Sequence, residues 1–337
     1  MSDNPIVVEV TRGGRVESVH RGAVCAVDAY GHLMLSIGDM EAPVFPRSAV
    51  KAIQALPLVE SGAADALGFG NRELAMACAS HSSEERHVEA ARVMLAAAGL
   101  DERALACGAH WPLFRTEALV ALAQGGGEPT PLHNNCSGKH AGFLCTCAHE
   151  AWEPDGYTSP DHPAMRGVRD TLQEVIGTPH SDDRMGTDGC NIPTWAVPLD
   201  ALAGAYARLG TGHGLGEARA KAASRLLAAT MAEPFYVAGT KRFDTRLMEA
   251  APNRVHAKVG AEGVYCASVP EAGLGIALKI AGGDVAAAEC AVAAILGQLL
   301  DGEGGRAITK LAHRTLRNWN GVDVGALRPT DALQVEA

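Results

Sequence analysis

A serine and a lysine stand three residues apart in the segment Phe45-Pro46-Arg47-Ser48-Ala49-Val50-Lys51. On a helix, residues i and i+3 share a face, so the Lys51 amine could reach the Ser48 hydroxyl. A lysine acts as a base only when its amine is neutral, which burial or a nearby cation favours. A helix start also supplies backbone N–H groups for an oxyanion. The pair predicts a nucleophilic Ser48 activated by Lys51, and a helix-capping serine beside a solvated lysine is the alternative.

Two other positions fit the same chemistry. Lys258 begins the triplet Lys258-Val259-Gly260 in a late β segment, and Ser80 lies at a predicted helix break. Penicillin-binding proteins and serine β-lactamases carry a Ser-x-x-Lys at a helix start and a Lys-x-Gly on a late strand. The second lysine could bind a substrate carboxylate or lower the pKa of its neighbour. The alternatives are a lysine on an exposed strand face and a serine that caps a helix.

Two polar turns carry cysteine. Cys136 and Lys139 lie in the turn Asn134–His140, and Cys190 lies far along the chain in the turn Gly186–Pro193. Each turn is expected to open onto an apolar helix, so its backbone N–H groups are available to an anion. Cysteine with lysine or histidine in one turn, and a second cysteine elsewhere, could hold one zinc ion. Two buried thiols beside ordinary turns are the alternative.

The elements that position these residues suggest an α+β fold. Residues 5–40 and 255–281 are rich in valine and isoleucine and are broken by turns that contain glycine, which predicts antiparallel strands. Helical spacing of apolar residues marks 47–60, two helices within 71–100, and helices near 115–123, 139–150, 163–177, 194–208, 215–231, 240–250 and 284–301. We therefore expect one catalytic unit over 1–337. Its antiparallel sheet would come from both chain ends, with packed helices and a helical region of about 60–250 between them.

Bulk composition excludes several classes of protein. The 337 residues are 47% hydrophobic and 20% charged, which is globular rather than disordered. A net charge of −10 and the lack of a basic run argue against nucleic-acid binding. No apolar run approaches a membrane span, and the N-terminus lacks a signal-peptide pattern. Nine cysteines, an odd number, fit reduced thiols in the cytoplasm.

Taken together, five segments in order resemble the rhizobial-type, or class 3, L-asparaginases over about residues 5–300. They are Pro46–Lys51, Ala79–His81, Asn134–His140, Thr187–Cys190 and Lys258–Gly263. The resemblance implies a fold similar to serine β-lactamases, a homodimer, and hydrolysis of L-asparagine to L-aspartate and ammonia. It implies two serine–lysine pairs, Ser48 with Lys51 and Ser80 with Lys258. It also implies one zinc ion per chain at Cys136, Lys139 and Cys190, where the lysine must be neutral to coordinate.

Substrate contacts follow from charge. Asparagine carries an α-ammonium, for which Asp188 is the candidate, and an α-carboxylate, for which Arg47 is the candidate. Asn135 and His140 are nearby in sequence and complete the predicted substrate-binding set. The competing readings are a glutaminase or β-lactam hydrolase on the same fold, a zinc-binding protein without catalysis, and a zinc hydrolase whose metal-bound water is the nucleophile.

Overall fold

A computed structural model describes residues 4–335 of the chain, which divide into two compact units. The first, here called the sheet unit, contains the chain up to Ala49, Val197–His213 and the chain from Leu247 onward. The second, called the helical unit, contains Val50–Ala196 and Gly214–Arg246. The boundary between them falls between Ser48 and Lys51.

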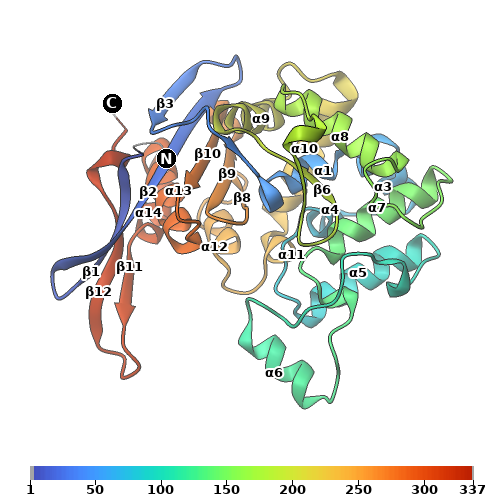
Figure 1. Ribbon diagram of the computed structural model, residues 1–337, viewed down its shortest axis with the longest axis horizontal. Coiled ribbons are helices and arrows are strands. Elements are labelled where there is room, and N and C mark those ends of the chain that lie inside the picture. Colours follow the sequence, from blue (N-terminus) through green and yellow to red (C-terminus); the bar gives the residue numbers. More distant parts are fainter. Residues whose placement is uncertain (1–3, 336–337) are drawn as a thin grey trace. The chain divides into compact units, whose positions relative to one another are not determined.

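The sheet unit is built on eight antiparallel strands in the order β11-β12-β1-β2-β10-β9-β8, with β3 paired to β2 (Figure 1). These strands are β1 (Ile6–Arg12), β2 (Arg15–Asp28), β3 (Leu33–Ile37), β8 (His256–Val259), β9 (Val264–Val269), β10 (Leu274–Ile280), β11 (Arg314–Arg317) and β12 (Asp323–Pro329). Strands from the beginning and the end of the chain are therefore neighbours. This confirms the predicted α+β fold with an antiparallel sheet made from both chain ends.

Strand β2 holds the two halves of the sheet together. Its first residues pair with β1, and its last seven pair with β10 in the register Gly22↔Ile280 to Asp28↔Leu274. The first half is mostly exposed, whereas Gly22–Val27 is buried throughout. The buried half carries the Ala-Val-Cys-Ala-Val run, whose small and β-branched side chains suit a strand covered on both faces.

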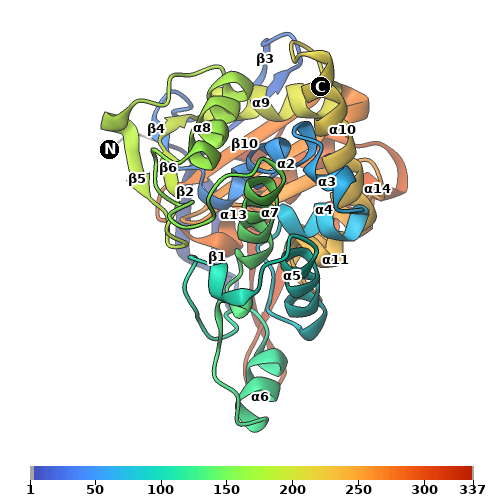
Figure 2. The same ribbon diagram turned by 90° about the vertical axis from the view of Figure 1, so that its right-hand side faces the viewer.

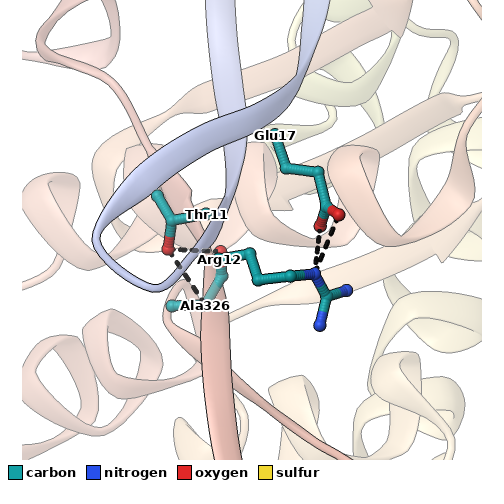
Figure 3. Close-up of polar contacts among 4 residues, drawn as sticks. All are labelled: Thr11, Arg12, Glu17 and Ala326. Carbon is teal, nitrogen blue, oxygen red and sulfur yellow. Dashed lines mark hydrogen bonds and ion pairs between the residues drawn. The ribbon is translucent and has the colours of Figure 1, made fainter.

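The chain ends are joined side by side in the outer half of the sheet. Thr11 of β1 lies opposite Ala326 of β12, and its hydroxyl donates to the Ala326 carbonyl at 3.3 Å (Figure 3). The Ala326 N–H donates back to the same hydroxyl at 3.1 Å. Arg12 and Glu17 add an exposed ion pair of 2.8 Å across the β1–β2 turn. Residues 315 positions apart thus share one ladder.

Two helices cover the inner strands. Helix α9 (Leu199–Thr211) contacts β2, β9 and β10, and α13 (Val285–Leu299) contacts β9, β10 and the outer pair β1 and β12. All six residues of β9 are buried, so both of its faces are covered. Helix α14 (Gly302–Leu311) packs on α13, and β4 (Pro43–Val44) pairs with β7 (Val197–Pro198).

The helical unit surrounds α7 (Ser137–His149), of which Ser137–Cys147 are all buried. Helix α7 contacts the helices before and after it in sequence, among them α4 and α5 (Figure 2). The other helices are α1 (Lys51–Gln54), α2 (Leu56–Glu60), α3 (Ala63–Ala66), α4 (Asn71–Ala77), α5 (Glu85–Ala97), α6 (Thr116–Gln124), α8 (Pro163–Ile176), α10 (Glu217–Ala232) and α11 (Pro234–Val237). Strands β5 (Met185–Thr187) and β6 (Pro193–Trp195) form a small hairpin, and α12 (Phe243–Ala250) runs from one unit into the other. None of the helices among the described residues is long and apolar enough to span a bilayer.

The structure differs from the predicted elements in three places. The helix expected over 47–60 is a 3-10 turn (Arg47–Val50) followed by α1 and α2, because Pro57 cannot donate to the carbonyl one turn earlier. The helix expected from 194 begins at Leu199, after the strands at Pro193 and Pro198. The residues after 301, for which no element was predicted, form α14 and the β11–β12 hairpin.

Candidate active site

Lys51 is completely buried in the helical unit, and its amine has three acceptors. It donates to the Ala79 carbonyl at 2.5 Å, the Ser80 hydroxyl at 2.9 Å and the Cys136 sulfur at 3.1 Å. An ammonium has three N–H donors, so this arrangement uses all of them. A buried lysine held against a serine hydroxyl is placed to exchange a proton with it.

The backbone of the α4–α5 loop fixes Ser80. The Ser80 N–H donates to the Val237 carbonyl at 2.9 Å, and the His81 N–H donates to the Asn135 carbonyl at 3.2 Å. The side chain of Ser80 is almost fully buried. The sequence resemblance pairs Ser80 with Lys258, whereas within the helical unit the Ser80 hydroxyl is bonded to Lys51.

Ser48 lies in the sheet unit, in the 3-10 turn Arg47–Val50 that leads into α1. Ser48 is partly exposed. Arg47 has φ +50°, a left-handed conformation that costs a non-glycine residue energy and is concentrated at functional sites. The Tyr206 hydroxyl of α9 donates to the Ala49 carbonyl, which fixes the turn from the other side of Ser48.

Lys258 is fully buried in the middle of β8, and its amine donates to the Val259 carbonyl at 2.9 Å. Two residues later, a Cβ on Gly260 would come within 2.7 Å of the Pro46 carbonyl. Only glycine permits so close an approach of two backbones. The end of β8 therefore lies against the residue two positions before Ser48, within the same unit.

Cys136, Lys139 and Cys190 converge in the helical unit. The Lys139 amine donates to the Cys190 sulfur at 3.0 Å, and Cys136 and Cys190 are hydrogen-bonded to each other. Cys136 precedes α7 and Lys139 is in its first turn, while Cys190 comes from the β5–β6 hairpin. All three side chains are buried. A helix start and a hairpin distant in sequence thus bring two sulfurs and an amine together.

Electrostatics favours one thiolate in this cluster. The hydrogen bond with Cys190 lowers the pKa of Cys136 well below its usual value, with Lys51 and Lys139 adding to the effect against burial. The same hydrogen bond, together with burial, raises the pKa of the Cys190 thiol. Burial alone would lower the pKa of Lys139, but the negative charge of Cys190, Cys136 and Asp188 raises it.

The donor set fits zinc. Zinc prefers sulfur and nitrogen ligands, and the cluster offers two sulfurs and one amine. Among the described residues no three His, Cys, Asp or Glu side chains group as a metal site, so the third protein ligand would have to be Lys139. Binding would require both thiols and the amine to lose their protons.

The predicted substrate-binding residues of the helical unit lie around this cluster. Asn135 is next to Cys136, and its Oδ1 is 3.5 Å from the Cys136 sulfur. The His140 ring is buried, with Nδ1 at 2.5 Å from the Tyr157 hydroxyl. Asp188 is partly exposed in the hairpin, and its charge acts on both Lys139 and Cys190. Arg47 belongs to the sheet unit with Ser48.

Sequence reasoning missed three side chains that hold these residues. Tyr157 accepts the Ala106 N–H at 3.0 Å and contacts His140. The His110 ring nitrogen accepts the Asn135 N–H at 3.0 Å. Tyr206 supports the Ser48 turn. All lie in segments without a recognisable motif, so no sequence signal marks them.

Comparison with known proteins gives a family. The model of the family described as L-asparaginase II matches residues 8–329, nearly the whole chain. No curated protein matches the sequence.

Similar solved structures are remote. A crystal structure of Mglu matches with TM-score 0.35 and 15% identity over 87% of this chain, which spans 65% of that one. Mglu in its glutamate form matches with TM-score 0.35 and 16% identity over 79% of this chain and 57% of that one. A variant of the class A β-lactamase of the last common ancestor of Gram-negative bacteria matches with TM-score 0.30 and 15% identity. The match covers 87% of this chain and 90% of that one. The chain thus spans less than two thirds of Mglu, and similarity at these TM-scores carries no argument about its function.

Proposed function

The chain belongs to the L-asparaginase II family of amidohydrolases, and we propose that it hydrolyses L-asparagine to L-aspartate and ammonia. The observation that carries the proposal is the buried Lys51 amine. It comes three residues after Ser48 and is bonded to a second serine, Ser80, and to a candidate metal ligand, Cys136.

In the proposed reaction, the Ser48 oxygen attacks the side-chain amide carbon while Lys51, in its neutral form, takes the hydroxyl proton. Backbone N–H groups of the Arg47–Val50 turn stabilise the oxyanion. The proton then passes to the amide nitrogen and the C–N bond breaks, which releases ammonia and leaves an aspartyl ester on Ser48. Water cleaves that ester by the reverse proton path and frees aspartate. The 2.9 Å bond from Lys51 to Ser80 supports Ser80 as part of this path, and Lys258 is proposed as the second lysine.

Cys136, Lys139 and Cys190 would hold one zinc ion, whose positive charge would help to orient the substrate. Around it, Asp188 and Arg47 are proposed to bind the α-ammonium and α-carboxylate, with Asn135 and His140 as further polar contacts. The convergence of the three ligand atoms supports this assignment.

Ammonia release from the two amino-acid amides and colour change with a β-lactam test the proposal. Purified protein would be assayed with L-asparagine, L-glutamine and a chromogenic β-lactam, with and without added zinc, beside Ser48→Ala. We expect ammonia release from asparagine, and we expect turnover by Ser48→Ala to be lower by several powers of ten. Faster turnover of glutamine or of the β-lactam would make the protein a glutaminase or a β-lactam hydrolase. Near-normal turnover by Ser48→Ala, together with inactivation by chelator, would instead indicate a metal-bound water as nucleophile.

We further propose that the protein is a cytoplasmic homodimer. All nine cysteines are buried, which suits reduced thiols. Analytical ultracentrifugation under reducing conditions tests the dimer, and a sedimentation coefficient of a 35.0 kDa species at all concentrations would contradict it.

A further inference from the structure

The helical unit contains a cavity of about 650 Å³ away from the residues described above. Helix α5, helix α6 and the segment around Tyr236 line it, and neither Lys51, Ser80 nor any of the candidate zinc ligands does. Its volume is in the range of small-molecule sites, which bury most of a ligand of drug size or smaller. A function for this cavity is therefore independent of the proposed asparaginase activity.

Charged side chains line part of the cavity. They are Arg72, Arg86 and Arg92, with the carboxylates of Glu85 and Glu89 among them. Arg72 is paired with Glu73 at 2.6 Å, and Arg92 is paired with Glu89 at 2.5 Å. Within the described residues Arg86 makes no ion pair, so it is the arginine of this lining that no carboxylate holds, and the exposed Glu85 next to it is likewise unpaired.

Aromatic rings hold the Arg86 guanidinium in place. It lies 4.3 Å from the Phe235 ring centre and 5.0 Å from that of Tyr236, and Nη2 donates to the Tyr236 hydroxyl at 3.1 Å. The hydrogen bond to Glu73 is the main cause that raises the pKa of the Arg72 guanidinium, and the buried Tyr236 hydroxyl adds a smaller effect. Two cations therefore meet at one hydroxyl. Stacking fixes a guanidinium in advance, which suits recognition of a planar carboxylate.

Helix α6 contributes apolar side chains to the lining. Ala118, Ala121 and Leu122 of α6 line the cavity, and their i, i+3 and i+4 spacing places them on one helix face. No residue of α6 is buried although most of it is apolar, and Figure 2 shows this helix apart from the other helices of its unit. A ligand with a hydrocarbon body would cover this face.

We propose that the cavity binds a small organic carboxylate with an apolar body, its carboxylate on Arg86 and its body against α6. Inorganic phosphate has the charge but lacks the body, so it should bind more weakly. Glu85, an exposed carboxylate in the same lining, further disfavours ligands with two or more negative charges.

Isothermal titration of the full chain with hexanoate and with inorganic phosphate tests this inference. We expect saturable hexanoate binding that weakens at least tenfold in Arg86→Gln and several-fold in Arg86→Lys, which keeps the charge but loses the planar fork. Leu122→Ser should weaken hexanoate several-fold and leave phosphate unchanged. The control Arg103→Gln, which removes an exposed arginine paired with Asp101, should bind as the parent protein does. The absence of saturable hexanoate binding, equal affinity for phosphate, or full binding by Arg86→Gln would overturn the proposal.

Discussion

Lys51 and Cys136 are joined by a hydrogen bond of 3.1 Å between the Nζ and Sγ atoms, in the buried interior of the helical unit. The candidate base is thereby in direct contact with a candidate zinc ligand. Any change at one should be felt at the other, because a charged hydrogen bond in a low-dielectric interior is strong. The pair therefore offers variants that separate catalysis, metal binding and stability.

Replacing Lys51 with Met keeps the length of the side chain and removes its donors. Turnover of L-asparagine should fall by about 10²–10⁴-fold or more, as expected when a general base is lost. The Ala79 carbonyl and the Ser80 hydroxyl would each lose a buried partner, at a cost of roughly 1–3 kcal/mol. Steady-state kinetics and urea unfolding measure the two effects.

The matched control is Lys221→Met, on an exposed lysine of α10 that pairs with Glu217 at 2.6 Å. It should change turnover and stability little, since exposed ion pairs contribute less than about 1 kcal/mol. A Lys51→Met protein that turns over asparagine at the rate of this control would remove Lys51 from the mechanism.

The sulfur cluster predicts a stoichiometric metal that depends on two particular cysteines. Cys136→Ala and Cys190→Ala should each lose the zinc that the parent protein retains after preparation without chelator. Cys147→Ala should keep it, because Cys147 is buried in α7 and no residue of the cluster contacts it through a described hydrogen bond. Metal analysis by mass spectrometry gives the ratio of zinc to protein chains. Equal zinc in the parent protein and the three cysteine variants would place the metal elsewhere.

Buried neutral histidines should make the protein sensitive to mild acid. His87 is fully buried, its Nδ1 accepts the Glu84 N–H at 3.2 Å, and its Nε2 lies 3.0 Å from the Phe235 carbonyl. This pattern requires the neutral ring with the proton on Nε2. Burial lowers the pKa of His87, whereas the hydrogen bond to the Phe235 carbonyl and the charge of Glu84 act to raise it. Arg86 and Arg242 also face the ring, and the His81 ring stacks on it at 5.1 Å.

The sign of the effect follows from proton uptake. The unfolded chain binds protons on these histidines below about pH 6.5, whereas the folded chain does not until a lower pH, so the free energy of unfolding should fall as pH decreases through that window. Each such histidine contributes a slope of up to about 1.4 kcal/mol per pH unit. Urea unfolding between pH 8 and pH 5 measures it. His87→Gln should be less stable at pH 8 but show a shallower decline, and an unchanged slope would assign the sensitivity to other groups.

Much of this architecture could be predicted from the sequence, because buried strands have a composition rich in β-branched residues that can be recognised. The valine-rich runs at Val24 and Val264 predicted strands that the structure confirms, and both are inner strands of the sheet. The β11–β12 hairpin was missed, since residues such as Arg314 and Arg317 are exposed and give an edge strand no apolar alternation. The pairing of strands 315 residues apart likewise cannot be predicted from local sequence patterns.

The contacts of the candidate site also fall into those that the local sequence predicts and those that only the tertiary fold creates. Lys139 follows Cys136 by one helical turn, so local geometry brings these two together. Cys190 joins them only through the fold of the β5–β6 hairpin, and the resemblance to a family, rather than spacing, predicted it. The bond from Lys51 to Ser80 joins α1 to the loop after α4, a tertiary contact that neither motif encodes alone.

A last prediction concerns how α9 reaches the sheet. Gly275 of β10 lies so close to α9 that a Cβ there would overlap the Ala203 carbonyl and the Ala207 nitrogen, both of them backbone atoms. Helix α9 also carries Tyr206, which supports the turn of Ser48. Gly275→Ala must therefore push the helix off the strand, and we expect a loss of more than about 3 kcal/mol together with lower turnover. Gly282→Ala is the matched control, because no atom lies within 4 Å of its Cβ, and it should change stability by less than about 0.5 kcal/mol. Thermal and urea unfolding of the two variants decide the matter, and a Gly275→Ala protein as stable as Gly282→Ala would mean that α9 does not pack on β10 at this distance.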